Sequence, residues 1–174
     1  VLNRLNKPLS ERTDSDVREM MQYMQHVPLI RALHARHMSH LLRSSTLLYN
    51  LPEPPHIFVS RGDEPKAMFI VLSGRVGVLL VHDGLTFPGP VLPDFCTVCE
   101  KAIAEGTYQP HTVATRSEDC ILLMIPRAAY LSVLENVRKE DTESKVMKIE
   151  KSLLPLVGPL EKDIILRLAR ATST

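Results

Sequence analysis

The chain contains no tryptophan, only three cysteines and no long apolar run. Three cysteines are an odd number and too few for a disulfide scaffold, which indicates a reducing compartment. The longest apolar runs are Met68 to Leu72 and Val76 to Val81, far shorter than a membrane-spanning helix requires. We therefore expect a cytoplasmic protein without a membrane span.

Strong charge of either sign is also missing. Lys and Arg number 21 and Asp and Glu number 20, so the formal net charge is +1. This balance argues against a nucleic-acid partner held by bulk charge. Hydrophobic residues make up 44% of the 174 residues, a globular composition that needs no disulfide or metal for stability. The chain begins at Val1 without a signal-peptide pattern, and we expect it to be a piece of a longer polypeptide.

The first 50 residues have the spacing of helices. Thr13 is typical of an N-cap, with Asp14 and Asp16 near the positive end of the helix dipole. One apolar face follows, made of Val17, Met20, Met21 and Met24. Beyond Pro28, a second helical stretch has an apolar side made of Leu33, Met38, Leu41 and Leu42. Helices are therefore predicted before the middle of the chain.

The middle of the chain reads as short strands separated by turns. The predicted strands are His56–Ser60, Ala67–Leu72, Arg75–His82, His111–Arg116 and Ile121–Ile125. Gly74 fits a tight turn that needs positive φ. The Gly- and Pro-rich stretch 83–93 is predicted to be a loop with one edge strand, and 98–104 a short helix. A helix from Arg127 through Ile149 follows, with Pro126 in its first turn. The order predicts an α+β fold, an antiparallel β-roll or jelly-roll barrel flanked by N-terminal and C-terminal helices.

Two parts of the chain echo each other. Val27-Pro28-Leu29-Ile30-x-x-Leu33 recurs as Leu154-Pro155-Leu156-Val157-x-x-Leu160, with every pair 127 residues apart. A repeat this long indicates whole domains rather than solenoid units. We therefore predict a linker at 1–12, one domain at 13–152, and at 153–174 the opening helix of a second, truncated domain of the same kind.

One segment resembles a known family. Gly62-Asp63, followed by Met68-Phe69-Ile70-Val71-Leu72-Ser73-Gly74-Arg75-Val76, resembles the cyclic nucleotide-binding domain family over about residues 13 to 150. The internal echo resembles the tandem domains of cAMP- or cGMP-dependent protein kinase regulatory regions, and Arg12-Thr13 is similar to cAMP-regulated Rap exchange factors. The resemblance implies a regulatory module, not an enzyme, whose ligand is cAMP, cGMP or a related nucleotide or nucleoside.

The resemblance also implies a phosphate-binding cassette, and here the sequence departs from the family. Its usual pattern is Phe-Gly-Glu-x-Ala and, after a short helix and loop, Pro-Arg-Ala-Ala, in which the arginine pairs with the cyclic phosphate. The corresponding ligand-binding residues here are Cys99, Glu100, Lys101, Ala102, His111 and Thr112. Cys99 stands where glycine is expected, and His111 replaces the arginine. Two extra residues are placed at Thr97-Val98, with the register open by two positions. Binding of cyclic nucleotides is expected to be weak, altered or absent.

The ligand is expected to control the C-terminal helix and, through it, neighbouring domains of the same polypeptide. The alternative is a degenerate domain that no longer binds nucleotide and serves as a protein-protein interaction or scaffold module. A third interpretation joins Cys96 and Cys99 with His111 and Cys120 in a zinc site, although the second paired spacing of such sites is missing. No catalytic set stands out, and we expect no cofactor.

Overall fold

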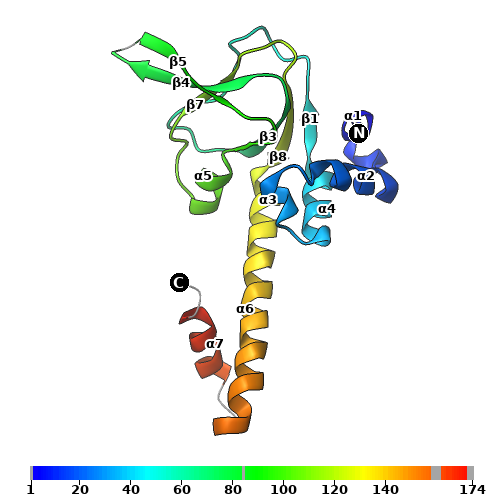
Figure 1. Cartoon of the computed structure of the whole chain (residues 1–174), viewed down its shortest axis with the longest axis vertical. Helices are drawn as coiled ribbons and strands as arrows, with labels where there is room; N and C mark the ends of the chain where they lie inside the picture. Colours follow the sequence, from blue (N-terminus) through cyan, green and yellow to red (C-terminus); the bar gives the residue numbers. More distant parts are fainter. Residues whose placement is uncertain (1, 84, 158–161, 172–174) are drawn as a thin grey trace. The chain divides into compact units, whose positions relative to one another are not determined.

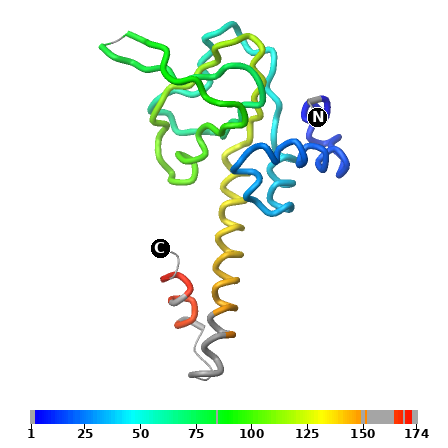
Figure 2. Tube along the Cα trace, in the orientation of Figure 1, coloured from blue at the N-terminus to red at the C-terminus, as the bar shows by residue number. Residues whose placement is uncertain are grey.

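The computed structural model describes residues 2–83, 85–157 and 162–171 (Figure 1). The chain divides into two compact units, Val1–Leu131 and Ser132–Thr174, which are described separately here. Figure 2 follows the chain through the first unit, from the N-terminal helices into the strands and back to a helix.

The first unit is built on two four-stranded antiparallel sheets. One has the order β1-β8-β3-β6 and the other β2-β7-β4-β5. The strands are β1 (Thr46–Leu48), β2 (Ile57–Val59), β3 (Ala67–Ser73), β4 (Val76–His82), β5 (Leu85–Leu92), β6 (Thr97–Val98), β7 (Thr112–Thr115) and β8 (Ile121–Pro126). The predicted α+β roll flanked by helices is confirmed. In the described part of the chain, no helix is long and apolar enough to cross a membrane.

The sheet that contains β3 and β8 is buried on both faces. Ile70, Val71, Leu122 and Leu123 are all almost fully buried, although neighbours along a strand point to opposite faces. Helix α4 (Ala35–Ser44) contacts β8, so helices contribute to covering this sheet. This double burial explains why β3 has a continuous apolar sequence rather than an alternating one.

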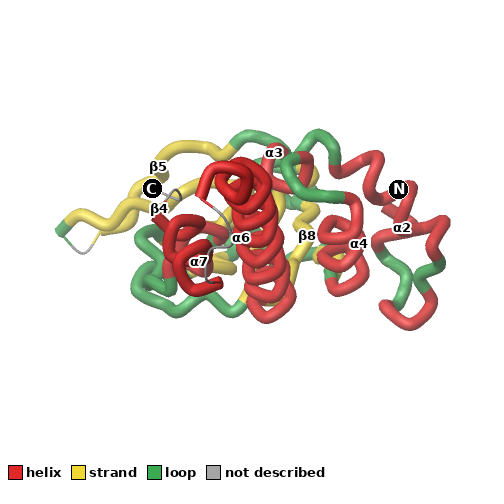
Figure 3. The backbone as a smooth tube through the Cα atoms, turned by 90° about the horizontal axis from the view of Figure 1, so that it is seen from below, coloured by secondary structure: helices red, strands yellow, loops and turns green. Residues whose placement is uncertain are grey.

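Helices precede the roll, as the sequence predicts. They are α1 (Leu2–Leu5), the 3₁₀ turn η1 (Leu9–Glu11), α2 (Asp14–Met24), α3 (Pro28–Arg31) and α4. Pro28 begins α3 at the position that tolerates a missing N–H. Two of these helices, α2 and α4, pack on each other (Figure 3). Of the predicted apolar faces, Val17, Met20, Met24, Met38, Leu41 and Leu42 are buried. Met21 and Leu33 are only half-buried, and Leu33 lies between α3 and α4.

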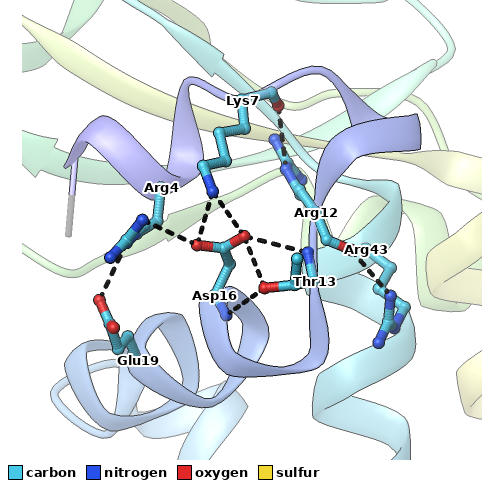
Figure 4. Close-up of polar contacts among 7 residues, drawn as sticks. All are labelled: Arg4, Lys7, Arg12, Thr13, Asp16, Glu19 and Arg43. Atoms are coloured by element: carbon cyan, nitrogen blue, oxygen red, sulfur yellow. Dashed lines mark hydrogen bonds and ion pairs between the residues drawn. The ribbon is translucent and has the colours of Figure 1, made fainter.

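A polar cluster joins the first twelve residues to α2 (Figure 4). Thr13 caps α2, because Asp16 N donates to Thr13 Oγ1 at 3.2 Å and Thr13 N donates to Asp16 Oδ2 at 3.0 Å. Lys7 Nζ and Arg4 Nη1 pair with the same carboxylate at 2.8 and 3.2 Å. The stretch 1–12, which the sequence indicates as a linker, is therefore tied to α2 by ion pairs.

Arg12 is buried and closes the ends of two helices. Its guanidinium donates to the carbonyl oxygens of Leu5 at 2.7 Å, Leu42 at 2.7 Å and Ser45 at 2.8 Å. These carbonyls lie at or just beyond the last turns of α1 and α4, where the regular i+4 donors are missing, and that of Leu42 also accepts from Ser45. One arginine therefore satisfies carbonyls from elements that are 30 and more residues apart.

Some elements differ from the sequence expectation. The stretch 83–93 is mostly the eight-residue strand β5, which lies at a sheet edge and tolerates Pro88 and Pro90 there. Strands β1 and β6 are too short for a period-2 pattern to reveal them. Pro126 ends β8 instead of opening the helix, which begins at Arg127.

The second unit contains most of α6 (Arg127–Val157) and α7 (Lys162–Ala171). Exposed pairs at i and i+4 support α6, with 2.8 Å between Glu135 and Lys139 and 2.8 Å between Asp141 and Lys145. Residues 153–157 continue α6, and residues 158–161 lie outside the described residues. The second domain inferred from the internal echo stays a prediction.

Candidate functional site

A cavity of about 410 Å³ lies in the first unit, where β4, β5, β6, α5 (Glu100–Glu105) and the segment before β7 meet. Its volume is in the range of small-molecule sites. Apolar side chains form much of the lining, with several polar groups among them. The lining residues are Val78, Leu92, Thr97, Val98, Cys99, Glu100, Lys101, Ala102, Glu105, Thr107, Tyr108, Gln109, Pro110, His111 and Val113.

The cavity gathers most of the residues that the sequence indicates as ligand-binding. These are Cys99, Glu100, Lys101, Ala102 and His111. Thr112 is not in the lining, and its Oγ1 accepts a hydrogen bond from the backbone N of Arg61 at 3.1 Å. Residues 11 positions apart meet here because α5 and the following segment bring the chain back to the same opening. Their role in binding stays a prediction.

Cys99 has an unusual backbone for its residue type. It precedes α5 with φ 75°, in the left-handed region that favours glycine. This is the position at which the resemblance implies glycine, so the backbone shape is kept although the side chain differs. Cys99 is buried, at 6% exposure.

The fixed charge of the cavity is negative. Two carboxylates, Glu100 and Glu105, and one ammonium, Lys101, line it, which gives 1 − 2 = −1 with histidine left out. Lys101 Nζ lies 3.9 Å from Glu105 Oε1, so the one ammonium is already beside a carboxylate. Among the described residues that line the cavity there is no arginine.

The charge of Glu100 acts on buried groups nearby. Burial raises the pKa of Cys99 to about 12, and Glu100 adds to this shift. Burial likewise raises the pKa of Cys96 to about 11, with Glu100 and Asp94 adding to it. The pKa of Tyr130 is raised by burial first and by Glu100 second. All three groups are uncharged near neutral pH, and the start of α6 lies within reach of the cassette charge.

Glu105, Tyr108 and Gln109 are among the lining residues that the predicted ligand-binding set does not contain. Glu105 ends α5, and the next two lie in the segment between Gly106 and β7. The only signal in the sequence that could have placed these residues at the cavity is that they shortly precede Pro110. Thr97 and Val98, where the two extra residues were placed, form β6 and pair with Ile70 and Phe69 of β3, and the placement itself stays a prediction.

The zinc interpretation finds no geometric support. Within the ranges that the structure describes, no group of three or more His, Cys, Asp or Glu side chains could hold a metal ion. Cys120 Sγ instead donates to the carbonyl oxygen of Arg75 at 3.1 Å, at the turn between β3 and β4.

No protein-family profile and no curated protein matches this chain. Solved structures do match. The cAMP-bound regulatory domain of Toxoplasma gondii protein kinase A is 15% identical with a TM-score of 0.62, over 92% of this chain and 60% of that one. The regulatory subunit of a cAMP-independent protein kinase A from Trypanosoma cruzi, bound to guanosine, is 15% identical with a TM-score of 0.57, over 92% and 54%.

A third match is the corresponding regulatory subunit from Trypanosoma brucei, as a triple mutant bound to cAMP. It is 15% identical with a TM-score of 0.56, over 92% of this chain and 57% of that one. This chain thus spans 60% or less of the length of these three regulatory proteins. These structural matches show that this chain has the fold of cyclic nucleotide-binding domains.

Proposed function

We propose that the first unit is a regulatory module that binds an uncharged nucleoside, rather than a cyclic nucleotide, in the 410 Å³ cavity. The observation that carries this proposal is the charge of the lining, which comprises Glu100, Glu105, Lys101 and no arginine among its described residues. A ribose offers hydroxyl donors that carboxylates accept, whereas a cyclic phosphate meets repulsion in a negative site.

The missing arginine has a measurable cost for phosphate binding. A guanidinium pairs with a phosphate through two parallel hydrogen bonds, which histidine cannot form. A charge-assisted hydrogen bond contributes about 1.5–3 kcal/mol, so His111 in its place weakens cyclic nucleotide binding by roughly 10- to 100-fold. A ligand without a phosphate loses nothing through this exchange.

The trypanosomal relatives support the proposal. One is bound to guanosine. The other is bound to cAMP as a mutant in which a glutamate became alanine, a threonine seven residues later became arginine, and the adjacent valine became alanine. This chain has Glu105, Thr112 and Val113, the unmutated residue types at the same spacing, since 112 − 105 is 7. The likeness is one of residue types and spacing.

Regulation would run from α5 to the start of α6. Tyr130, in the first turn of α6, is buried at 3% exposure, and the charge of Glu100 contributes to its raised pKa. When a ligand hydroxyl hydrogen-bonds to Glu100, the electrostatic field at Tyr130 changes. The same contact shifts α5 relative to the packed region around Tyr130. A ligand shifts the equilibrium between two packing arrangements of a helix only by the difference in its affinity for the two arrangements.

Calorimetric titration tests the proposal. Adenosine, guanosine, inosine and uridine are compared with cAMP and cGMP, using the whole chain. At least one nucleoside is expected to bind saturably and more tightly than either cyclic nucleotide. The Glu105→Ala substitution should reduce this difference in affinity between nucleoside and cyclic nucleotide. The matched control is Glu118→Gln, an exposed carboxylate outside the cavity lining. Tighter binding of cAMP or cGMP than of every nucleoside would contradict the proposal.

A second candidate function is protein-protein interaction, and the β4–β5 hairpin favours it. Its exposed apolar side chains are Leu80, Val81, Leu85, Phe87 and Val91. In Figure 1 this hairpin extends away from the other strands of the first unit. Exposed apolar side chains gathered in this way often mark an interaction surface. If none of the six ligands binds, this candidate becomes the better one.

A further inference from the structure

Gln109 is held in place by its backbone at the edge of the cavity. Its N–H donates to the carbonyl oxygen of Asp63 at 2.9 Å, and its carbonyl accepts from the N–H of Gly62 at 2.8 Å. These two bonds tie the segment before β7 to the turn between β2 and β3. The side chain of Gln109 therefore starts from a fixed backbone.

The side-chain oxygen of Gln109 is buried and has no partner among the described residues. The residue is only 7% exposed, and Oε1 accepts no hydrogen bond from any residue that the structure describes. Buried carbonyl oxygens in native proteins are nearly always hydrogen-bonded, so an exception calls for an explanation such as a ligand. Gln109 lines the cavity together with Cys99, and both also line a second cavity of about 540 Å³ beside β2 and β3.

The exposures of the lining residues indicate which part of a nucleoside meets this amide. Tyr108 is 71% exposed and offers an aromatic ring at the mouth of the cavity, where a base can stack. Gln109, the next residue, lines the same cavity and is buried, so its acceptor lies farther from solvent than the ring of Tyr108. A base at the mouth leaves the sugar at the buried end, where its hydroxyls are the donors available to Oε1.

We propose that Gln109 is a ligand-binding residue whose Oε1 accepts a hydrogen bond from a sugar hydroxyl of the bound nucleoside. This inference rests on the proposed function and adds to it a specificity for ribose hydroxyls. The free protein carries the unpaired acceptor, and the ligand supplies its donor. A sugar that lacks the hydroxyl leaves Oε1 unpaired in the complex as well.

The test combines one variant with deoxy analogues. The tightest-binding nucleoside and its 2′-, 3′- and 5′-deoxy forms are titrated against the wild-type chain and Gln109→Met. One deoxy form is expected to bind the wild type roughly 3- to 10-fold more weakly than the parent. The Gln109→Met variant should bind the parent nucleoside more weakly by the same factor, and it should bind the parent and that deoxy form equally well. The melting temperature of ligand-free Gln109→Met should equal or exceed that of the wild type, because no protein contact of Oε1 is lost.

The outcomes separate the two proposals. If no nucleoside binds the wild type, both fail. If a nucleoside binds but all three deoxy forms bind equally well, or if Gln109→Met binds the parent unchanged, the role of Gln109 is refuted and the proposed function stands. A lowered melting temperature with unchanged affinity would likewise make Gln109 merely structural. Lys66→Met is the control, since Lys66 lines the second cavity and not the first; a loss of affinity in this variant would place the ligand in the second cavity and contradict the 410 Å³ cavity as the binding site.

Discussion

Lys7 Nζ donates to both carboxylate oxygens of Asp16, at 2.9 Å to Oδ1 and 2.8 Å to Oδ2. The same carboxylate accepts from the backbone of Thr13 and pairs with Arg4. The hydrogen bond from Lys7, followed by that from the Thr13 backbone, holds the pKa of Asp16 well below its ordinary value of 3.8. Asp16 of α2 therefore connects its helix to the capping residue Thr13 and to Arg4 of α1.

This relationship predicts an acid-dependent loss of stability. Because the folded pKa of Asp16 lies below the unfolded one, its contribution is complete above about pH 5 and declines as the pH falls through 3.8 and below. Urea unfolding of the wild type and Asp16→Asn should show a clear difference in the free energy of unfolding at pH 7 and a smaller one at pH 3. A difference that stays constant between these two pH values would contradict this account.

Two glycines with the same backbone angle should respond differently to alanine. Gly62 and Gly74 both have φ +85°, which costs an alanine roughly 1–2 kcal/mol. A Cβ at Gly62 meets nothing within 4 Å, whereas a Cβ at Gly74 would lie 2.6 Å from Cys120 Cα. Gly74→Ala should therefore lower the free energy of unfolding by about 1 kcal/mol or more beyond Gly62→Ala. Denaturant unfolding of both variants measures this, and equal losses would show that the turn at Gly74 has room to adjust.

The cassette thiols should be unreactive in the folded protein. Burial raises the pKa of Cys96 to about 11 and that of Cys99 to about 12, so almost no thiolate exists at pH 8. Iodoacetamide at pH 8 should alkylate both slowly in the native chain and rapidly in urea, as followed by mass spectrometry. Fast native alkylation of Cys99 would show that the start of α5 opens readily, and a Cys96–Cys99 disulfide would revive a redox role.

An arginine placed in the cavity should create affinity for cAMP. In a Glu105→Ala background, His111→Arg removes one carboxylate and adds a guanidinium at a position that lines the cavity. We expect a gain in cAMP affinity of roughly 10- to 100-fold by calorimetry, from the charge-assisted hydrogen bonds. Thr112→Arg tests the other register, in which the spacing of the trypanosomal mutant puts the arginine at 112. It should gain less cAMP affinity, because Thr112 lies outside the lining. A larger gain from Thr112→Arg would assign the phosphate-binding position to residue 112.

Local sequence patterns were sufficient to predict most of the fold. Thr13 with Asp16, Pro28, Gly74 and the apolar stretch Ala67–Leu72 each indicated their element from neighbouring residues alone, and the structure confirms them. The edge strand β5 was only partly predicted, because Pro88 and Pro90 are tolerated there through the sheet position and not through propensity. Strands β1 and β6, of three and two residues, were missed, whereas the equally short β2 was predicted from its β-branched and aromatic run.

The candidate site divides in the same way. The family resemblance named Cys99-Glu100-Lys101-Ala102 and His111 from a local motif, and the structure places them around one cavity, while their role in binding stays a prediction. Contacts between distant segments decide that Gln109 is buried with an oxygen that is unpaired among the described residues. They also decide that Glu105 and Tyr108 line the same cavity and that Thr112 does not. The amino-acid order determined which elements form, because capping, turns and apolar spacing act over a few residues. Only the tertiary structure decided which polar groups meet across the cavity and which remain unsatisfied, because burial and partnering are properties of the packed chain.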